Sequence, residues 1–163
     1  MKCLVFSDSH SKIYYMREII RMHSDAEAIF FLGDGLKEAD LLRSEFPDKI
    51  WVAVRGNCDM FSYFGDRPAE KLESLWLSGY KISATHGDLY GAKYGLGGLI
   101  KLACDSGSDI VLFGHTHEPT QKYISDFEKP IYLFNPGSIS GVGGSYGIMD
   151  LGKQPFFSHG EII

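Results

Sequence analysis

The sequence lacks most of what would place it in a membrane, in a disulfide-rich scaffold or in a secretion pathway. Its three cysteines, Cys3, Cys58 and Cys104, are an odd number without a C-x-x-C pair, which argues against a disulfide framework and indicates a reducing compartment. No apolar run approaches the roughly 18 to 20 residues that a membrane-spanning helix needs. The N-terminal apolar stretch, residues 3–6, is too short for the apolar region of a signal peptide. We therefore expect a cytoplasmic protein without a membrane partner.

Positive charge is also scarce. The chain has 16 Lys and Arg residues against 21 Asp and Glu residues, a formal net charge of −5. Proteins that hold nucleic acid through a broad basic surface usually show the opposite balance, so we expect no such surface here. The length of 163 residues, with 44% apolar and 23% charged residues, predicts a single globular domain over residues 1–163.

Short apolar runs alternate with amphipathic stretches in the first part of the chain, as they do in α/β domains. After residue 110 the pattern indicates strands alone. Two packed sheets with helices on their outer faces accommodate both parts. The segment 59–69 has no periodic pattern, and long loops of this kind are often functional. The predicted strands are 3–6, 28–32, 50–54, 72–77, 81–85, 110–113, 121–125, 131–134, 146–150 and 155–162, and the predicted helices are 11–23, 37–46 and 96–104.

Side chains that bind metals follow five of the predicted strands. In open α/β sheets, ligands bind at the carboxyl ends of the strands, so these side chains are expected on one rim. Carboxylate and imidazole groups suit divalent ions such as Mn, Fe, Zn, Ni or Co. Seven candidate ligands are too many for one tetrahedral ion, but they suit two ions with a bridging carboxylate. The seven are Asp8, His10, Asp34, Asn57, His86, His115 and His117.

The local spacing supports this interpretation. In an extended segment, residues two apart point the same way, which would bring together the two ligands within residues 8–10 and the two within 115–117. Each motif alone has an ordinary alternative, since residues 7–9 also suit a helix N-cap and residues 33–35 a plain turn. The five motifs together make those alternatives improbable. Glycines that would permit tight turns and close backbone approach beside the ligands are Gly33, Gly56, Gly87 and Gly114.

These motifs resemble those of a known family. The series D-x-H, G-D, G-N-x-[DE], H-G and G-H-x-H is that of the calcineurin-like metallophosphoesterases. The chain is most similar to their small, single-domain bacterial and archaeal phosphodiesterase branch. Residues 135–138, Asn-Pro-Gly-Ser, are similar to a late loop of that branch. The resemblance implies an α/β fold, a four-layer sandwich of two mixed β-sheets flanked by α-helices.

The resemblance also implies roles for the candidate ligands. Asp8, His10, Asp34 and His117 would hold one divalent ion, and Asp34, Asn57, His86 and His115 the other, with Asp34 bridging. Mn is the first choice of metal, with Ni, Zn, Fe or Co as alternatives. A metal-bridging hydroxide would then attack a small phosphoester substrate in line. The expected catalytic residues are Asn57, Asp59 and His86, and the expected substrate-binding residues are Arg55 and Asn57.

One position departs from the wider family. Many members have a histidine where this chain has Cys58, and that histidine acts as the general acid toward the leaving group. A thiol, with a reference pKa of about 8.5, donates a proton to oxygen poorly. We therefore hypothesise that aryl and other good leaving groups are hydrolysed fastest. Asp59 loses the histidine that it supports in the family, and Cys58 is alternatively a small buried residue.

The remaining candidates leave alternatives open. Four aromatic residues would form an apolar wall beside the substrate, or else belong to the core or to a dimer contact. They are Tyr63, Phe64, Tyr90 and Tyr94. Arg67 and Lys93 are expected to be surface charges, and His23 and His159 to be structural or exposed. The alternatives to a phosphodiesterase are a phosphomonoesterase acting on a small metabolite and a non-catalytic scaffold of the same fold, as in a retromer-type trafficking complex. A homo-oligomer also stays open.

Overall fold

The computed structural model describes residues 1–60 and 63–163. The strands are β1 (Lys2–Phe6), β2 (Ala28–Phe31), β3 (Ile50–Ala53), β4 (Tyr63–Phe64), β5 (Arg67–Pro68), β6 (Leu72–Leu77), β7 (Tyr80–Thr85), β8 (Ile110–Leu112), β9 (Thr120–Ile124), β10 (Ile131–Asn135), β11 (Ser145–Leu151) and β12 (Pro155–Glu161). The α-helices are α1 (Ile13–Met22), α2 (Leu36–Glu45) and α3 (Gly97–Ser106), and 3-10 turns span Asp88–Tyr90 and Ala92–Tyr94.

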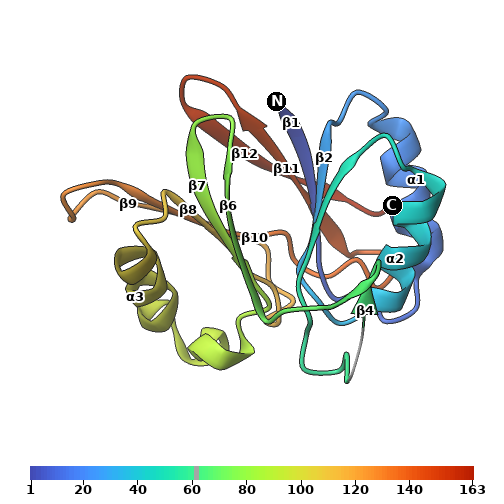
Figure 1. Ribbon diagram of the computed structural model, residues 1–163, viewed down its shortest axis with the longest axis horizontal. Coiled ribbons are helices and arrows are strands. Elements are labelled where there is room, and N and C mark those ends of the chain that lie inside the picture. The colour runs from blue at the N-terminus through green and yellow to red at the C-terminus, as the bar shows by residue number, and fades with distance from the viewer. Residues whose placement is uncertain (61–62) are drawn as a thin grey trace.

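Two five-stranded mixed sheets face each other (Figure 1). The first has the order β12-β11-β1-β2-β3, and the second the order β6-β7-β8-β10-β9. Strands β1, β2 and β3 run parallel, as do β7, β8 and β10. The pairs β1–β11, β11–β12, β6–β7 and β9–β10 are antiparallel. Helices α1 and α2 cover the outer face of the first sheet, and α3 covers that of the second (Figure 1). The predicted four-layer sandwich of two mixed sheets flanked by helices is confirmed.

Strand β1 shows why the layers form. Residues 3–6 have no exposed surface, because this central strand is covered on both faces. Leu4 and Phe6 pack beneath α1 and α2, whereas Cys3 and Val5 pack between the two sheets. Alternate side chains of one strand therefore join the outer layer formed by α1 and α2 to the centre of the sandwich.

The predicted elements agree with the structure to within one or two residues at most ends. The β6–β7 turn is shorter than expected, because Leu77 pairs with Tyr80 and leaves only Ser78 and Gly79 in the turn. Both turn residues have positive φ, at 49° and 86°, as tight hairpins require. The segment 59–69 contains the short hairpin β4–β5, and its residues 61 and 62 lie outside the described residues. Within residues 1–60 and 63–163, no helix is long and apolar enough to cross a membrane.

Candidate metal centre

The loops that follow β1, β2, β3, β7 and β8 meet at one rim of the sandwich. Contacts between the two sheets show how closely they approach. The His115 backbone N–H donates to Asp8 Oδ2 over 3.1 Å, and His86 Nδ1 lies 2.7 Å from the carbonyl oxygen of Leu32. The structure thus brings the candidate ligands from both sheets together.

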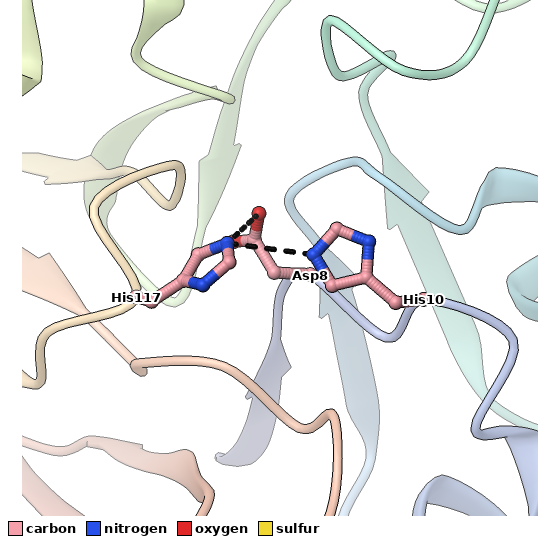
Figure 2. Close-up of side chains that lie close together, drawn as sticks. All are labelled: Asp8, His10 and His117. Carbon is pink, nitrogen blue, oxygen red and sulfur yellow. Dashed lines mark hydrogen bonds and ion pairs between the residues drawn. The ribbon is translucent and has the colours of Figure 1, made fainter.

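The first group of ligands contains Asp8, His10 and His117, whose ligand atoms all lie within 4.8 Å of one another. His117 Nε2 is 3.1 Å from Asp8 Oδ1 and 3.4 Å from His10 Nε2. Figure 2 shows the two rings turning these nitrogens toward each other beside the carboxylate. Asp8 is fully buried, but His10 and His117 are exposed, so this group opens to solvent.

The second group surrounds His86, whose side chain has no exposed surface. Its Nε2 lies 3.0 Å from Asn57 Oδ1 and 3.5 Å from Asp34 Oδ2. Nδ1 of His115 is also near, at 3.2 Å from the same nitrogen. Asp8 lies within 4.8 Å of the Asp34 and His86 ligand atoms, so Asp8 belongs to both groups. The bridging role expected for Asp34 stays a prediction.

Hydrogen bonding determines which nitrogen of His86 is available. The Leu32 carbonyl can only accept, so His86 Nδ1–H donates to it. In the neutral ring, Nε2 then carries no proton and faces Asn57 Oδ1 at 3.0 Å, acceptor against acceptor. A metal ion bound by both atoms would make this arrangement favourable. An imidazole fixed through its other nitrogen is also the usual form of a metal-bound histidine. The donor set, with carboxylates, imidazoles and an amide oxygen, fits divalent metal ions.

The local electrostatics favour the metal-binding forms of these side chains. Burial tends to raise the pKa of Asp34, but the 2.8 Å hydrogen bond from the Cys58 backbone N–H and the nearby His86 outweigh it, so the pKa is lowered. Burial, with further contributions from His86 and Lys93, lowers the pKa of His115 and favours its neutral ring. Hydrogen bonding to Asp34 raises the pKa of the Cys58 thiol, which is exposed rather than buried. The alternative of a buried Cys58 is therefore wrong.

The backbone at the ligands is not extended. Five ligands have φ between 42° and 68°, in the left-handed region that non-glycine residues seldom adopt. The alternation argument for residues 8–10 and 115–117 is therefore wrong, because both motifs leave their strands and turn sharply. Backbone strain of this kind is concentrated at functional sites, where surrounding contacts hold it in place. The five are Asp8, His10, Asp34, His115 and His117.

Asp59 connects two of the ligand loops through backbone hydrogen bonds. Its carboxylate accepts from Asp34 N–H at 2.6 Å and Gly56 N–H at 3.0 Å. It also accepts from the N–H groups of Gly35 and Leu36, at 2.9 and 3.0 Å, where α2 begins. A negative charge is favourable at a helix N-terminus, where such groups lack partners. These contacts favour a positioning role for Asp59, because it acts on the backbone of Asp34.

The end of β10 and the loop after it support the ligand loops that follow β8 and β1. Asn135 is fully buried, and its Nδ2 donates to the Gly114 carbonyl and to Thr116 Oγ1, each at 3.0 Å. The Ser138 hydroxyl donates to the Asp8 carbonyl at 2.9 Å. These supporting contacts were not predicted from the sequence. The only available signal was the resemblance of residues 135–138 to a family loop.

The predicted substrate contacts are less well assembled than the metal ligands. Arg55 follows β3, and its Nε is buried without a hydrogen-bond partner among the residues that the structure describes. The four aromatic residues do not form one wall, because Phe64 packs in the core beneath α2 and Tyr90 in the core beneath α3. Tyr63 and Tyr94 are exposed. Arg67 forms a surface ion pair with Glu73, Lys93 is exposed, and His23 contacts Tyr146.

Comparison with known proteins identifies the family. The sequence model of the calcineurin-like phosphoesterase superfamily domain matches residues 1–154. The chain belongs to this superfamily. It is 32% identical over 140 residues to the probable metallophosphoesterase YsnB of Bacillus subtilis, covering 85% of this chain and 75% of that protein. It is 24% identical over 172 residues to the phosphodiesterase MJ0936 of Methanocaldococcus jannaschii, covering 96% of each.

Solved structures show the same fold. A predicted phosphoesterase from Streptococcus pneumoniae TIGR4 has a TM-score of 0.76 at 24% identity, covering 96% of this chain and 87% of that one. Vacuolar Protein Sorting 29 from Cryptosporidium parvum has a TM-score of 0.74 at 17% identity, covering 99% and 97%. At such identities the likeness concerns the fold alone.

Proposed function

We propose that the chain is a phosphodiesterase that depends on two divalent metal ions. The observation that carries this proposal is the cluster of metal-ligand atoms around His86 Nε2, whose neutral ring has its proton on Nδ1. The first ligand group, beside it, shares Asp8 with the second. Kinship with a phosphodiesterase of M. jannaschii over 96% of the chain supports the diester as substrate. We further propose that the metal is Mn, with Ni, Zn, Fe or Co as alternatives, and that the protein acts in the cytoplasm.

Two bound ions would supply an activated water and would offset charge on the phosphoryl oxygens. The residues of the chain prepare the site for them. Asp8 and Asp34 provide buried negative charge, and Leu32 holds the ring of His86 in place. We propose that the exposed amide of Asn57 orients the phosphoryl group and that Arg55 contacts its oxygens.

Asp59 is proposed to act indirectly, by fixing the backbone of Asp34 and Gly56. It was expected among the catalytic residues, but its carboxylate accepts hydrogen bonds from backbone N–H groups. Because the histidine that it supports in many family members is absent, its remaining role is to hold two ligand loops at a fixed separation.

A non-catalytic scaffold is the second candidate, because Vacuolar Protein Sorting 29 shares the fold. The chain nevertheless retains all seven candidate ligands, which a scaffold does not need. A phosphomonoesterase is less well supported than a diesterase, since a dianionic substrate favours more cationic side chains near the metal. Among the residues proposed to contact substrate, Arg55 is the only one with a permanent positive charge.

The test is an assay of the purified chain after chelation and reloading with Mn, Ni, Zn, Co or Mg. Bis(4-nitrophenyl) phosphate and 4-nitrophenyl phosphate are compared under each condition. We expect metal-dependent turnover that favours the diester. Faster turnover of the monoester would overturn the diester assignment, and no turnover with any metal would overturn the enzyme assignment.

A single variant tests the assigned site. Asn57→Ala removes an exposed amide beside His86, and we expect it to abolish turnover while leaving the fold intact. The control is Gln154→Ala, which also removes an exposed side-chain amide. Gln154 lies in the turn between β11 and β12 and not in a loop that carries candidate ligands. Full activity in Asn57→Ala would place the reaction elsewhere.

A further inference from the structure

A groove of about 470 Å³ lies directly beside the exposed ligand His117. It runs between the loop that follows β10 and the C-terminal strand β12, so the rim of the sandwich continues past the metal ligands. Its volume is in the range of small-molecule sites. The polar side chains that line it are those of His117, Ser138, Ser140, Ser145, His159 and Glu161.

The protons of the two serines nearest the metal ligands can be assigned from their partners. The Ser138 hydroxyl lies 2.9 Å from the Asp8 carbonyl oxygen and 2.9 Å from Ser140 Oγ. Ser138 is the donor in both contacts, so its single proton is shared between the Asp8 carbonyl and Ser140 Oγ and is not available to a ligand. Ser138 Oγ therefore offers a ligand only lone pairs. The Ser140 hydroxyl accepts in this contact and keeps its own proton.

The same accounting applies to two other lining residues. The Ser145 hydroxyl donates to the Pro136 carbonyl at 2.7 Å, so its oxygen keeps only lone pairs. His159 Nε2 lies 2.7 Å from the Asn135 carbonyl oxygen and must donate to it. In the neutral ring, His159 Nδ1 is then an acceptor as well. Ser138, Ser145 and this imidazole are thus left as acceptors, and Ser140 alone among these side chains keeps a hydroxyl proton.

Charge reinforces this pattern. Glu161 is exposed at the end of β12, and its backbone pairs with Ser145. None of the residues lining the groove is Lys or Arg. A carboxylate and a set of acceptors attract hydrogen-bond donors and positive charge, and they repel anions. The groove therefore has the opposite chemistry to a phosphate site, although it begins at a residue proposed to hold a metal for phosphate chemistry.

We propose that this groove binds an alcohol portion of the phosphodiester and selects an alcohol that carries ammonium or hydroxyl donors. An alcohol that bears a second anionic group is disfavoured, because Glu161 repels it and no lining lysine or arginine offsets its charge. The inference rests on the proposed diesterase activity, since it assumes that the phosphoryl group lies at the ligands around Asp8. It adds a substrate class, amino alcohols and polyols, to the proposed reaction.

The test compares 4-nitrophenyl phosphodiesters that differ only in the second alcohol. The alcohols are 2-aminoethanol, ethylene glycol, ethanol and 3-hydroxypropionic acid, and kcat/KM is measured for each. We expect the amino and hydroxyl esters to be hydrolysed fastest and the carboxylate ester slowest. Equal kcat/KM values for the amino and carboxylate esters would overturn the inference. If no diester is hydrolysed with any metal, the proposed function itself fails, and the two failures are thus distinguished.

Glu161→Gln isolates the carboxylate. We expect the ratio of kcat/KM between the amino and carboxylate esters to fall about three- to fivefold, as for an exposed ion pair. Glu161→Lys should reverse the preference. Glu128→Gln makes the same charge change in the exposed loop between β9 and β10, and we expect it to leave the ratio unchanged. An equal effect of Glu128→Gln would show that net charge, and not the groove, sets the preference.

Binding can be followed without turnover. The 2-aminoethyl ester of methylphosphonic acid is titrated into Zn-loaded protein, and the amide NMR signals of Gly141, Gly143 and Gly144 are recorded. These glycines line the groove. We expect their signals to shift in the wild-type protein, with severalfold weaker binding in Glu161→Gln. Shifts confined to the metal ligands would overturn the inference.

Discussion

The two halves of the candidate metal centre differ in how firmly the chain holds them. His86 and Asp34 are buried, with exposed fractions of 0% and 4%, although Asn57 beside them is exposed. His10 and His117 are open to solvent, and the His117 side chain is 48% exposed. Leu32 fixes the ring of His86 from the end of β2, whereas His10 and His117 contact each other at the surface. The chain itself therefore holds the buried half in place, and the open half is accessible to solvent.

The largest effect is expected at the residue that both halves share. Asp8→Asn removes the carboxylate common to the two ligand groups. We expect kcat/KM for bis(4-nitrophenyl) phosphate to fall at least about 1000-fold, equivalent to about 4 kcal/mol of transition-state stabilisation. Asp126→Asn, in the exposed loop between β9 and β10, is the control for charge. A fall in kcat/KM of less than tenfold in Asp8→Asn would contradict the view that both ligand groups depend on this carboxylate.

The close packing of the buried half can be tested through stability. A Cβ at Gly33 would lie 2.5 Å from the Gly56 nitrogen, and φ there is +96°. Gly79, at φ +86°, has no atom within 4 Å of such a Cβ. In urea unfolding, we expect Gly79→Ala to cost about 1 kcal/mol for backbone strain, and Gly33→Ala to cost about 2 kcal/mol more because the backbones must separate. Equal losses of unfolding free energy in the two variants would mean that the loops of Gly33 and Gly56 are not closely packed.

The comparison is sharpened by removing one histidine from each half. His86→Ala deletes a ring fixed from the core, while His10→Ala deletes an exposed ring that other ligands or water can replace. We expect activity losses of about 100-fold and about 10-fold, respectively. Metal analysis of both variants after dialysis against EDTA should show that His10→Ala retains the more tightly held ion. The reverse order of metal loss would contradict the assignment of the buried half.

The smallest effect concerns leaving-group protonation at the open side. Cys58 is exposed, and its raised pKa keeps the thiol protonated and weakly acidic. Cys58→His should accelerate the hydrolysis of alkyl esters by about tenfold or more, within the usual range of general acid catalysis, and change aryl esters little. The measurement is a series of diesters with leaving groups of different pKa, followed across pH. A wild-type rate that does not depend on leaving-group pKa would contradict the hypothesis that the leaving group is poorly protonated.

Much of this arrangement was predictable from the sequence, because the residues that follow parallel strands lie at the same edge of the sheet. Parallel strands deliver their following residues to one rim, and the polar residues after β1, β2, β3, β7 and β8 were visible as interruptions of apolar runs. The periodic patterns also placed α1, α2 and α3. Positions of this kind depend on local patterning and sheet topology, which a single sequence carries.

What the sequence could not show depends on contacts between distant residues. The positive φ of Asp8 and His117 is held by surrounding contacts, so alternation in an extended chain was the wrong local geometry. Asp59 reaches backbone N–H groups 23 to 25 residues away, and no spacing rule predicts that capping. The acceptor character of the groove beside His117 likewise follows only from knowing each hydroxyl's partner.

The most direct test of the account is the number of Mn ions bound per chain, measured by equilibrium dialysis and elemental analysis of metal-depleted protein. The two ligand groups around Asp8 predict two ions per chain at saturation, with the more tightly held ion at His86. Saturation at a single ion, or no binding above that of the Asp8→Asn variant, would contradict the dinuclear centre on which the proposed reaction depends.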